Sequence, residues 1–209
     1  MSGKSGRNAI YISCDVEASG KAPPYSMLSF GLSVVGEPSK SLYVELKPLN
    51  DLAEPGAMNV HKLTMDELKK NGLSPKEAME AAKKWVAEVS QGRKAIFASW
   101  GTFDWMYMKW YLTNYGDPEL FGHNSIEIKS FVAGVLGVPY DEMDSKTLKE
   151  RLGIEFKNVH NALADAIEQG EILHACQLLN RQQKAERDSA MHGAVRNGTA
   201  SSGRVALKG

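Results

Sequence analysis

The chain has 209 residues, of which 43% are apolar; this is long enough for one substantial hydrophobic core and predicts a single domain. Lys and Arg together number 25 and so do Asp and Glu, so the formal net charge is zero, which argues against a broad basic face for nucleic acid. No apolar run reaches the roughly 18 to 20 residues of a membrane helix, and residues 1–8 do not resemble a secretion signal, so we expect a soluble, cytoplasmic protein with no membrane partner.

The two cysteines, Cys14 and Cys176, lack the CxxC spacing of a zinc or redox site. Two isolated cysteines fit a reducing compartment, and each is predicted to be a small buried apolar residue. The cysteines therefore point away from zinc and redox chemistry.

Three extended stretches come first along the chain: Ala9–Glu17, Met27–Val35 and Ser41–Leu46. They are rich in β-branched and aromatic residues and are separated by turns with Gly and Pro, a pattern that predicts an antiparallel meander. Capping boxes then open two helices, at Thr64–Glu67 and Ser74–Glu77. In the second helix, apolar residues at helical spacing predict a face toward the core: Ala78, Ala81, Ala82, Trp85, Val86 and Val89.

The second half of the chain alternates short apolar strands with helices. Strands are predicted at Lys94–Ser99 and Ser125–Ile128, and helices at Phe103–Tyr115, Ser130–Leu136, Ser145–Leu152 and from Asn161 past Leu179. Three antiparallel strands followed by strands that alternate with helices predict an α/β fold, in which a mixed sheet carries helices on both faces. We expect this domain to span residues 9–180.

Residues 181–209 differ from the rest of the chain in composition. Apolar periodicity fades into Gly, Ser, Ala and isolated charges, so we predict a flexible tail. The tail holds six of the 25 basic residues but two of the 25 acidic ones, which leaves residues 1–180 with a formal charge of −4. A nucleic-acid ligand would therefore be attracted by metal ions, local lysines or this basic tail.

Two carboxylates, Asp15 and Glu17, end the first predicted strand. The two-residue period of a strand points both to one side and Val16 to the other. Their repulsion would raise a pKa or destabilise the fold unless a cation lay between them, so a divalent metal site is the functional interpretation. Because an Asp-x-Glu tripeptide is more often a solvated surface pair, this pattern needs support from the rest of the chain.

Two later segments supply that support. Asp104 follows the strand at Lys94–Ser99 and opens the next helix, where α/β sheets bind ligands, although it would also complement the helix dipole. His160 and Asp165 open the last predicted helix. In a helix they would lie roughly 140° apart, so they converge only if His160 lies on the loop or cap before the helix while Asp165 faces the sheet.

Together these motifs resemble the DEDDh exonucleases, a family that includes the proofreading subunit of bacterial replicases, ribonuclease T and oligoribonuclease. Asp15-x-Glu17 with Ser19-Gly20 is similar to the first family motif, Phe103-Asp104 to the second, His160-x-x-x-x-Asp165 to the third, and Ala57–Thr64 to the family's Val-His-Gly-Ile-Thr segment. The resemblance covers about residues 9–180. Asn161 stands where the sister subclass carries tyrosine, so the resemblance is to the histidine type.

The resemblance implies a ribonuclease H-like fold and a 3′-to-5′ exonuclease that releases nucleoside 5′-monophosphates. Its partner would be the 3′ end of single-stranded RNA or DNA. Four carboxylates would hold two divalent cations, Mg²⁺ or Mn²⁺, with Asp15 bridging them: Asp15, Glu17, Asp104 and Asp165.

The resemblance also implies roles for three other residues. His160 would take a proton from the attacking water, a role that suits an imidazole at neutral pH. By analogy, Ser19 would contact the 3′ terminus. His61 would lie near the substrate, although a structural hydrogen bond fits His61 equally well.

Two departures from the family pattern concern substrate contacts more than chemistry. Trp100-Gly101-Thr102 replaces the asparagine that often precedes the second motif, and Lys62 stands where the family often has glycine. Ser26–Gly31 and Gly101–Trp105 are more similar to the small stand-alone exoribonucleases than to polymerase proofreaders.

Two other functions compete with the enzyme. One is a non-catalytic nucleic-acid-binding module on the same scaffold, which the five filled catalytic positions argue against. The other is an adaptor or homodimer that associates through an aromatic-rich helix with Trp105, Met106, Tyr107, Met108, Trp110 and Tyr111. Because these side chains surround the helix, packing or an oligomer contact is favoured over base stacking.

Overall fold

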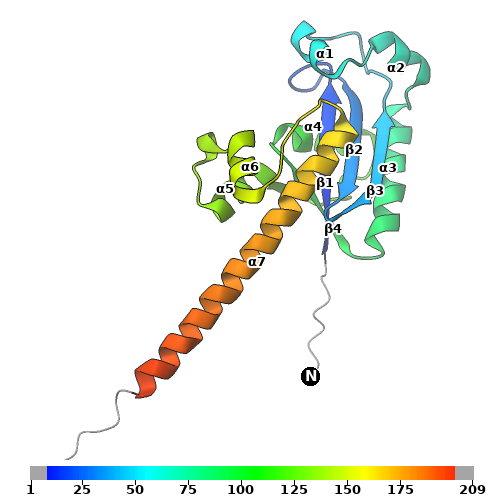
Figure 1. Cartoon of the computed structure of the whole chain (residues 1–209). Coiled ribbons are helices and arrows are strands. Elements are labelled where there is room, and N and C mark those ends of the chain that lie inside the picture. Colours follow the sequence, from blue (N-terminus) through cyan, green and yellow to red (C-terminus); the bar gives the residue numbers. More distant parts are fainter. Residues whose placement is uncertain (1–8, 201–209) are drawn as a thin grey trace, which may run out of the picture.

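A five-stranded sheet forms the centre of the computed structural model, which describes residues 9–200 and their side chains through Met191 (Figure 1). The strands are β1 (Ala9–Ala18), β2 (Met27–Val34), β3 (Glu37–Glu45), β4 (Lys94–Ser99) and β5 (Ser125–Glu127). They lie in the order β3-β2-β1-β4-β5. The pairs β3–β2 and β2–β1 are antiparallel, and the pairs β1–β4 and β4–β5 are parallel. The predicted mixed sheet is confirmed.

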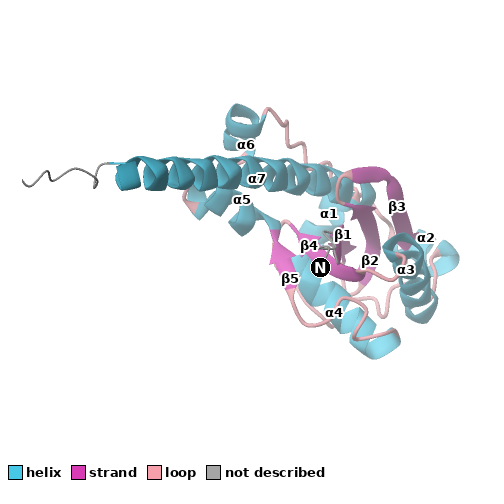
Figure 2. Cartoon of the chain, turned by 90° about the horizontal axis from the view of Figure 1, so that it is seen from below, coloured by secondary structure: helices cyan, strands magenta, loops and turns pink. Residues whose placement is uncertain are grey.

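Helices cover both faces of this sheet (Figures 1 and 2). They are α1 (Pro55–His61), α2 (Met65–Asn71), α3 (Pro75–Ser90), α4 (Phe103–Tyr115), α5 (Ile128–Leu136), the 3₁₀ turn η1 (Tyr140–Glu142), α6 (Ser145–Leu152) and α7 (Ala162–Ala200). One buried core joins the sheet to α3 and α4, and a second joins it to α5, α6 and α7. The prediction of helices on both faces is therefore confirmed.

Alternation along β1 decides which face of the sheet carries the acidic residues. Cys14 and Val16 belong to the core with α3 and α4, whereas Asp15 contacts α7 on the other face. Gly31 on β2 pairs with Asp15, and a Cβ atom at Gly31 would lie 2.2 Å from the carbonyl oxygen of Ala162. The start of α7 therefore approaches the sheet beside Asp15 because residue 31 has no side chain.

The predicted helix starts agree with the structure, and one further helix is present. The Ser74 hydroxyl accepts from the backbone N–H of Glu77 and completes a capping box at α3, and Thr64 caps α2 through Glu67. The additional helix is α1, whose sequence signal is a proline in its first turn, Pro55.

Helix α7 continues to Ala200 and runs away from the sheet (Figures 1 and 2). The predicted flexible tail from residue 181 is thus helical as far as residue 200; residues 201–209 lie outside the described part. Apolar periodicity does fade here, but the run from Arg181 to Arg187 consists of residues that favour helix by themselves, and Lys184 pairs with Asp188 one turn away. The domain boundary at residue 180 stays a prediction.

Across residues 9–200, no helix is long and apolar enough to cross a membrane.

Candidate active site

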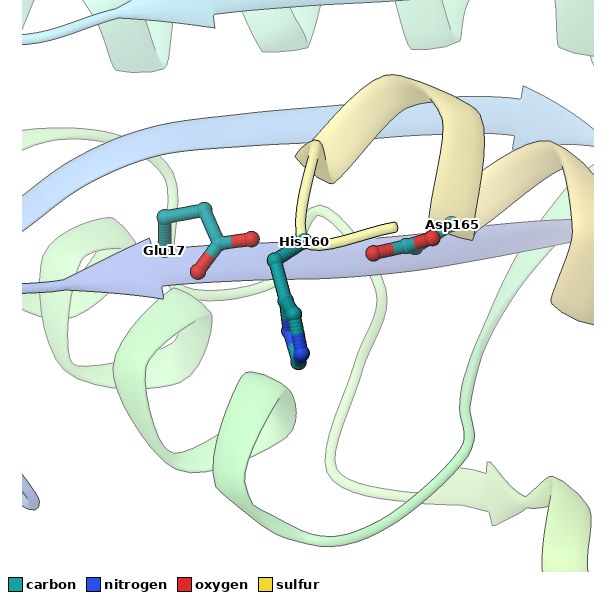
Figure 3. Close-up of side chains that lie close together, drawn as sticks. All are labelled: Glu17, His160 and Asp165. Carbon is teal, nitrogen blue, oxygen red and sulfur yellow. The ribbon is translucent and has the colours of Figure 1, made fainter. Parts of the chain in front are cut away.

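Three of the predicted site residues converge at the end of β1. One potential ligand atom from each of Glu17, His160 and Asp165 lies within 4.8 Å of the others, and Figure 3 shows the three side chains grouped over the strand. Glu17 comes from β1 and Asp165 from the first turn of α7, so residues separated by almost 150 positions meet at one place. Two carboxylates and one imidazole therefore lie within reach of the same bound ligand.

Asp104 joins the same site from the helix that follows β4. It lies in the first turn of α4, is only 6% exposed, and its Oδ1 accepts a hydrogen bond of 3.0 Å from the backbone N–H of Val16. Val16 separates Asp15 from Glu17, so this bond places the third carboxylate directly beside the first two. Asp104 therefore does more than complement the dipole of α4.

His160 lies on the loop before α7, in the left-handed region of backbone conformation with φ of +57°. The carboxylate of Asp165 accepts from the backbone N–H of Val159 at 2.8 Å and of Asn161 at 3.2 Å. The Asn161 side chain caps the helix through the N–H of Ala164. These bonds turn His160 back toward Asp165, as the predicted convergence required.

A second anchor holds the chain that leads to His160. The carboxylate of Glu168 accepts from the backbone N–H groups of Lys157 at 2.8 Å and Asn158 at 3.0 Å. Earlier in the same segment, the ring of Phe156 packs against Trp100, with 4.8 Å between ring centroids. The first two turns of α7 and the end of β4 thus hold the loop from both sides.

Burial and mutual repulsion strongly perturb the carboxyl groups of the site. Burial and then the charge of Asp165 raise the pKa of Asp15 to about 7, against an opposing hydrogen bond from Gln169. Burial and then the charge of Asp15 raise the pKa of Glu17 to about 8. Burial and the charge of Asp15 also hold the pKa of Asp104 well above its usual range. Each raised pKa shows that burying several negative charges close together is energetically unfavourable.

The donor set fits divalent cations. Among the described side chains, no lysine or arginine forms an ion pair with Asp15, Glu17, Asp104 or Asp165. Clustered carboxylates without a cationic side chain need another source of positive charge, and carboxylate oxygens are the ligands that Mg²⁺ and Mn²⁺ prefer. These four residues could therefore hold such ions.

Ser19 and His61 lie close to this cluster but in different settings. The Ser19 side chain is fully buried, and its hydroxyl accepts from the backbone N–H of Ser26 at 2.9 Å, which closes the loop after β1. His61, at the end of α1, accepts at Nδ1 from the N–H of Leu63, and burial lowers its pKa. The structural hydrogen bond expected for His61 is present, and the substrate roles of both residues stay predictions.

A hollow of about 490 Å³ adjoins Glu17, and its wall includes Lys21, Glu54, Val60, His61 and Phe103. It combines apolar surface with charged groups of both signs. Its position next to the acidic cluster makes it a candidate ligand-binding site.

The aromatic-rich helix is mainly a packing element. Tyr107 and Tyr111 are fully buried, with hydroxyl groups that bond to the carbonyl of Gly20 and the N–H of Met27, respectively. Trp105 packs partly buried against the same core. The interpretation as packing is confirmed for these residues, and a homodimer stays a prediction.

Gln169 belongs to the site and was not anticipated from the sequence. It is 1% exposed, donates from Nε2 to Oδ1 of Asp15 at 2.8 Å and accepts at Oε1 from the backbone N–H of Trp100 at 3.1 Å. Its position four residues after Asp165, on the same face of α7, is the signal that could have found it.

No known family profile matches the chain. Among solved structures, it is similar to the nuclease domain of 3′hExo, a DEDDh family member bound to rAMP, with a TM-score of 0.64, 13% identity, and coverage of 86% of this chain and 95% of that one. It is also similar to Escherichia coli exonuclease I in complex with a dT13 oligonucleotide, with a TM-score of 0.61, 20% identity, and coverage of 86% and 43%. These likenesses establish the ribonuclease H-like fold.

Sequence similarity decides the family. Over 181 residues the chain is 34% identical to the 3′-5′ DNA exonuclease Cap18 of Escherichia coli, a match that covers 85% of this chain and 97% of that protein. The chain belongs to the DEDDh 3′-to-5′ exonucleases. The exonuclease acts on nucleic acid, and the divalent-metal dependence of the family agrees with its acidic cluster.

The metal-free exonuclease is expected to lose stability as the pH rises from about 4 to about 8. The pKa values of Asp15 (about 7) and Glu17 (about 8) lie above the ordinary values of 3.8 and 4.5, so the folded state retains protons that the unfolded chain releases. The resulting stabilisation is complete below the ordinary pKa values and is lost as the pH rises through the pKa values of the folded state.

Urea unfolding in EDTA at several pH values measures this change. A double variant, Asp15→Asn with Glu17→Gln, should flatten the dependence over the same window, and Mg²⁺ should restore stability to the wild type at pH 8. Identical pH dependence in the wild type and the double variant would show that these two groups do not titrate as stated.

Proposed function

We propose that the exonuclease hydrolyses single-stranded nucleic acid from its 3′ end and releases nucleoside 5′-monophosphates, using two divalent cations, Mg²⁺ or Mn²⁺. The observation that carries this proposal is the convergence of Glu17, His160 and Asp165 at the point where Asp104 reaches β1 beside Asp15. When bound, two such cations would activate a water molecule and stabilise charge on the leaving 3′ oxygen.

The protein supplies geometry and a proton acceptor for this reaction. Asp15, Glu17, Asp104 and Asp165 would hold the cations, and the backbone N–H groups bonded to Asp104 and Asp165 keep those two carboxylates in place. His160 is exposed and lies at the cluster, so its imidazole can take a proton from the water and pass it to solvent. A water oxygen–phosphorus bond forms as the bond from phosphorus to the 3′ oxygen breaks.

The hollow beside Glu17 supports recognition of a terminal nucleotide. Phe103 and Val60 offer apolar surface for a base or sugar, and Lys21 offers a positive charge for phosphate. The Escherichia coli relative is a DNA exonuclease, which favours DNA as the substrate. The segments Ser26–Gly31 and Gly101–Trp105 resemble exoribonucleases, which favours RNA. Purified protein with Mn²⁺ on matched single-stranded DNA, single-stranded RNA and recessed duplexes tests the preference, and DNA is expected to be degraded faster.

A blocked 3′ end should slow degradation strongly, and a blocked 5′ end should not. The reason is that the site would grip a terminal 3′ hydroxyl beside Glu17, so hydrolysis begins only at an end. A strand labelled at its 5′ end should give a ladder that shortens by one nucleotide at a time, together with free 5′-monophosphates.

Closed circles of the same single strand provide the control and should survive. Cleavage of the circles that disappears in the Asp15→Asn variant would show endonuclease activity from this site. That result would overturn the proposed mode of action.

A further inference from the structure

Gln169 makes two hydrogen bonds that connect the acidic cluster to the rest of the fold. Its Nε2 donates to Oδ1 of Asp15 and its Oε1 accepts from the backbone N–H of Trp100. At 1% exposure, the side chain is shielded from solvent. Loss of either bond would therefore leave a buried polar group without a partner.

The chemistry of its partners sets the orientation of this amide. A backbone N–H can only donate, so the Trp100 N–H must face the carbonyl oxygen of Gln169. The NH₂ group is then turned toward Asp15, whose ionised carboxylate can only accept. One rigid amide thus satisfies a donor on one side and an acceptor on the other, an arrangement that neither carboxylate nor thioether side chains can reproduce at neutral pH.

The two bonds connect the three elements that carry the acidic residues. Asp15 lies on β1, Trp100 lies immediately after β4 in the turn that leads to Asp104, and Gln169 lies on α7 one turn beyond Asp165. A shift of α7 or of the turn would therefore move the carboxylate of Asp15. The bond to Oδ1 also restrains the position of that oxygen and leaves the second oxygen of the carboxylate for a ligand.

We propose that Gln169 is a positioning residue, whose amide orients Asp15 for cation binding and holds the turn before Asp104 against α7. This inference rests on the proposed function, because it takes Asp15 as a metal ligand. Groups that hydrogen-bond to metal ligands commonly contribute about 10 to 100-fold to metal affinity or activity. Gln169 should contribute through metal binding and turnover rather than through affinity for nucleic acid.

Gln169→Met tests the proposal, because methionine preserves length and volume but lacks the amide. We expect the dissociation constant for Mn²⁺, measured by calorimetry without substrate, to rise by about tenfold or more. The kcat should fall by a similar factor, with KM for a single-stranded oligonucleotide within about twofold of wild type, and excess Mn²⁺ should recover part of the kcat. Gln182→Met on the exposed part of α7 is the matched control and should leave all three quantities unchanged.

Metal-free melting curves separate positioning from a purely structural role. If Gln169→Met melts at a lower temperature but binds Mn²⁺ as the wild type does, Gln169 is only structural and the inference is wrong. If the methionine variant does not fold, Gln169→Asn replaces it, because asparagine keeps a buried amide that is too short to span both partners. A wild-type dissociation constant in that variant would likewise overturn the inference.

Failure of the proposed function has a different signature. It would appear as wild-type protein that binds no Mn²⁺, or as binding that Asp15→Asn leaves unchanged. Wild-type binding that is lost in Asp15→Asn but retained in both Gln169 variants would reject the role of Gln169 alone.

Discussion

Asp15→Asn and Asp104→Asn should each reduce hydrolysis by at least about 10³-fold, because several kcal/mol of transition-state stabilisation depend on correctly held cations. Asparagine keeps an oxygen that accepts from Gln169 at position 15 and from the Val16 N–H at position 104, so both variants should fold. Each substitution also removes a buried carboxyl group whose pKa is raised by burial and by neighbouring negative charges. The metal-free variants should therefore melt at a higher temperature than metal-free wild type.

Melting curves with and without Mg²⁺, together with single-turnover hydrolysis, measure both effects. Wild type should gain stability from Mg²⁺, and the two variants should gain less. Asp141→Asn, an exposed acid in η1, is the control and should change neither activity nor the response to Mg²⁺. Substantial activity in both site variants would show that the cluster is not the catalytic site.

Asp165→Asn should lose activity without the same gain in stability. The two oxygens of Asp165 accept from the backbone N–H groups of Val159 and Asn161, which hold the loop of His160. An amide at position 165 can accept through only one of its atoms, so one of these N–H groups loses its partner. The relief of repulsion is therefore offset by a less ordered loop.

His160→Asn should lower kcat by about 10² to 10⁴-fold, the usual contribution of a single general base. Asparagine is the suitable replacement because it tolerates the left-handed conformation at residue 160, where alanine would add backbone strain. Binding of Mn²⁺ and of a single-stranded oligonucleotide should stay within a few-fold of wild type.

His123→Asn supplies the control, because His123 is exposed on the loop before β5 and should contribute nothing to turnover. Rates at a fixed pH with saturating Mn²⁺ compare the two variants directly. Unchanged turnover in His160→Asn would remove this residue from the mechanism. A loss of Mn²⁺ binding as large as the loss of kcat would instead identify His160 as a metal ligand.

Local patterns in the sequence were sufficient for the fold class and for most of the residues that the structure gathers at the end of β1. Strand alternation separates Asp15 and Glu17 from Val16, and the structure places Val16 in the core opposite them, because the period of a strand is a property of the backbone itself. Capping at Ser74 is equally local, since a cap and the N–H that it satisfies lie three residues apart. The motif around His160 and Asp165 was visible too, but its geometry was not.

Only the tertiary structure decided how distant residues meet. His160 reaches Asp165 because residue 160 adopts a left-handed conformation and the Asp165 carboxylate binds the loop on both sides of it, whereas a continuous helix would have separated them. Gln169 joins Asp15 to the turn after β4 across 154 positions of sequence, a contact that no local period can predict. The helix beyond residue 180 could not be predicted from apolar periodicity. Fading periodicity shows that the segment no longer packs against the core, but it does not show that the backbone stops being helical. Periodicity shows which side of an element is buried, and the packing of elements determines which side chains share a site.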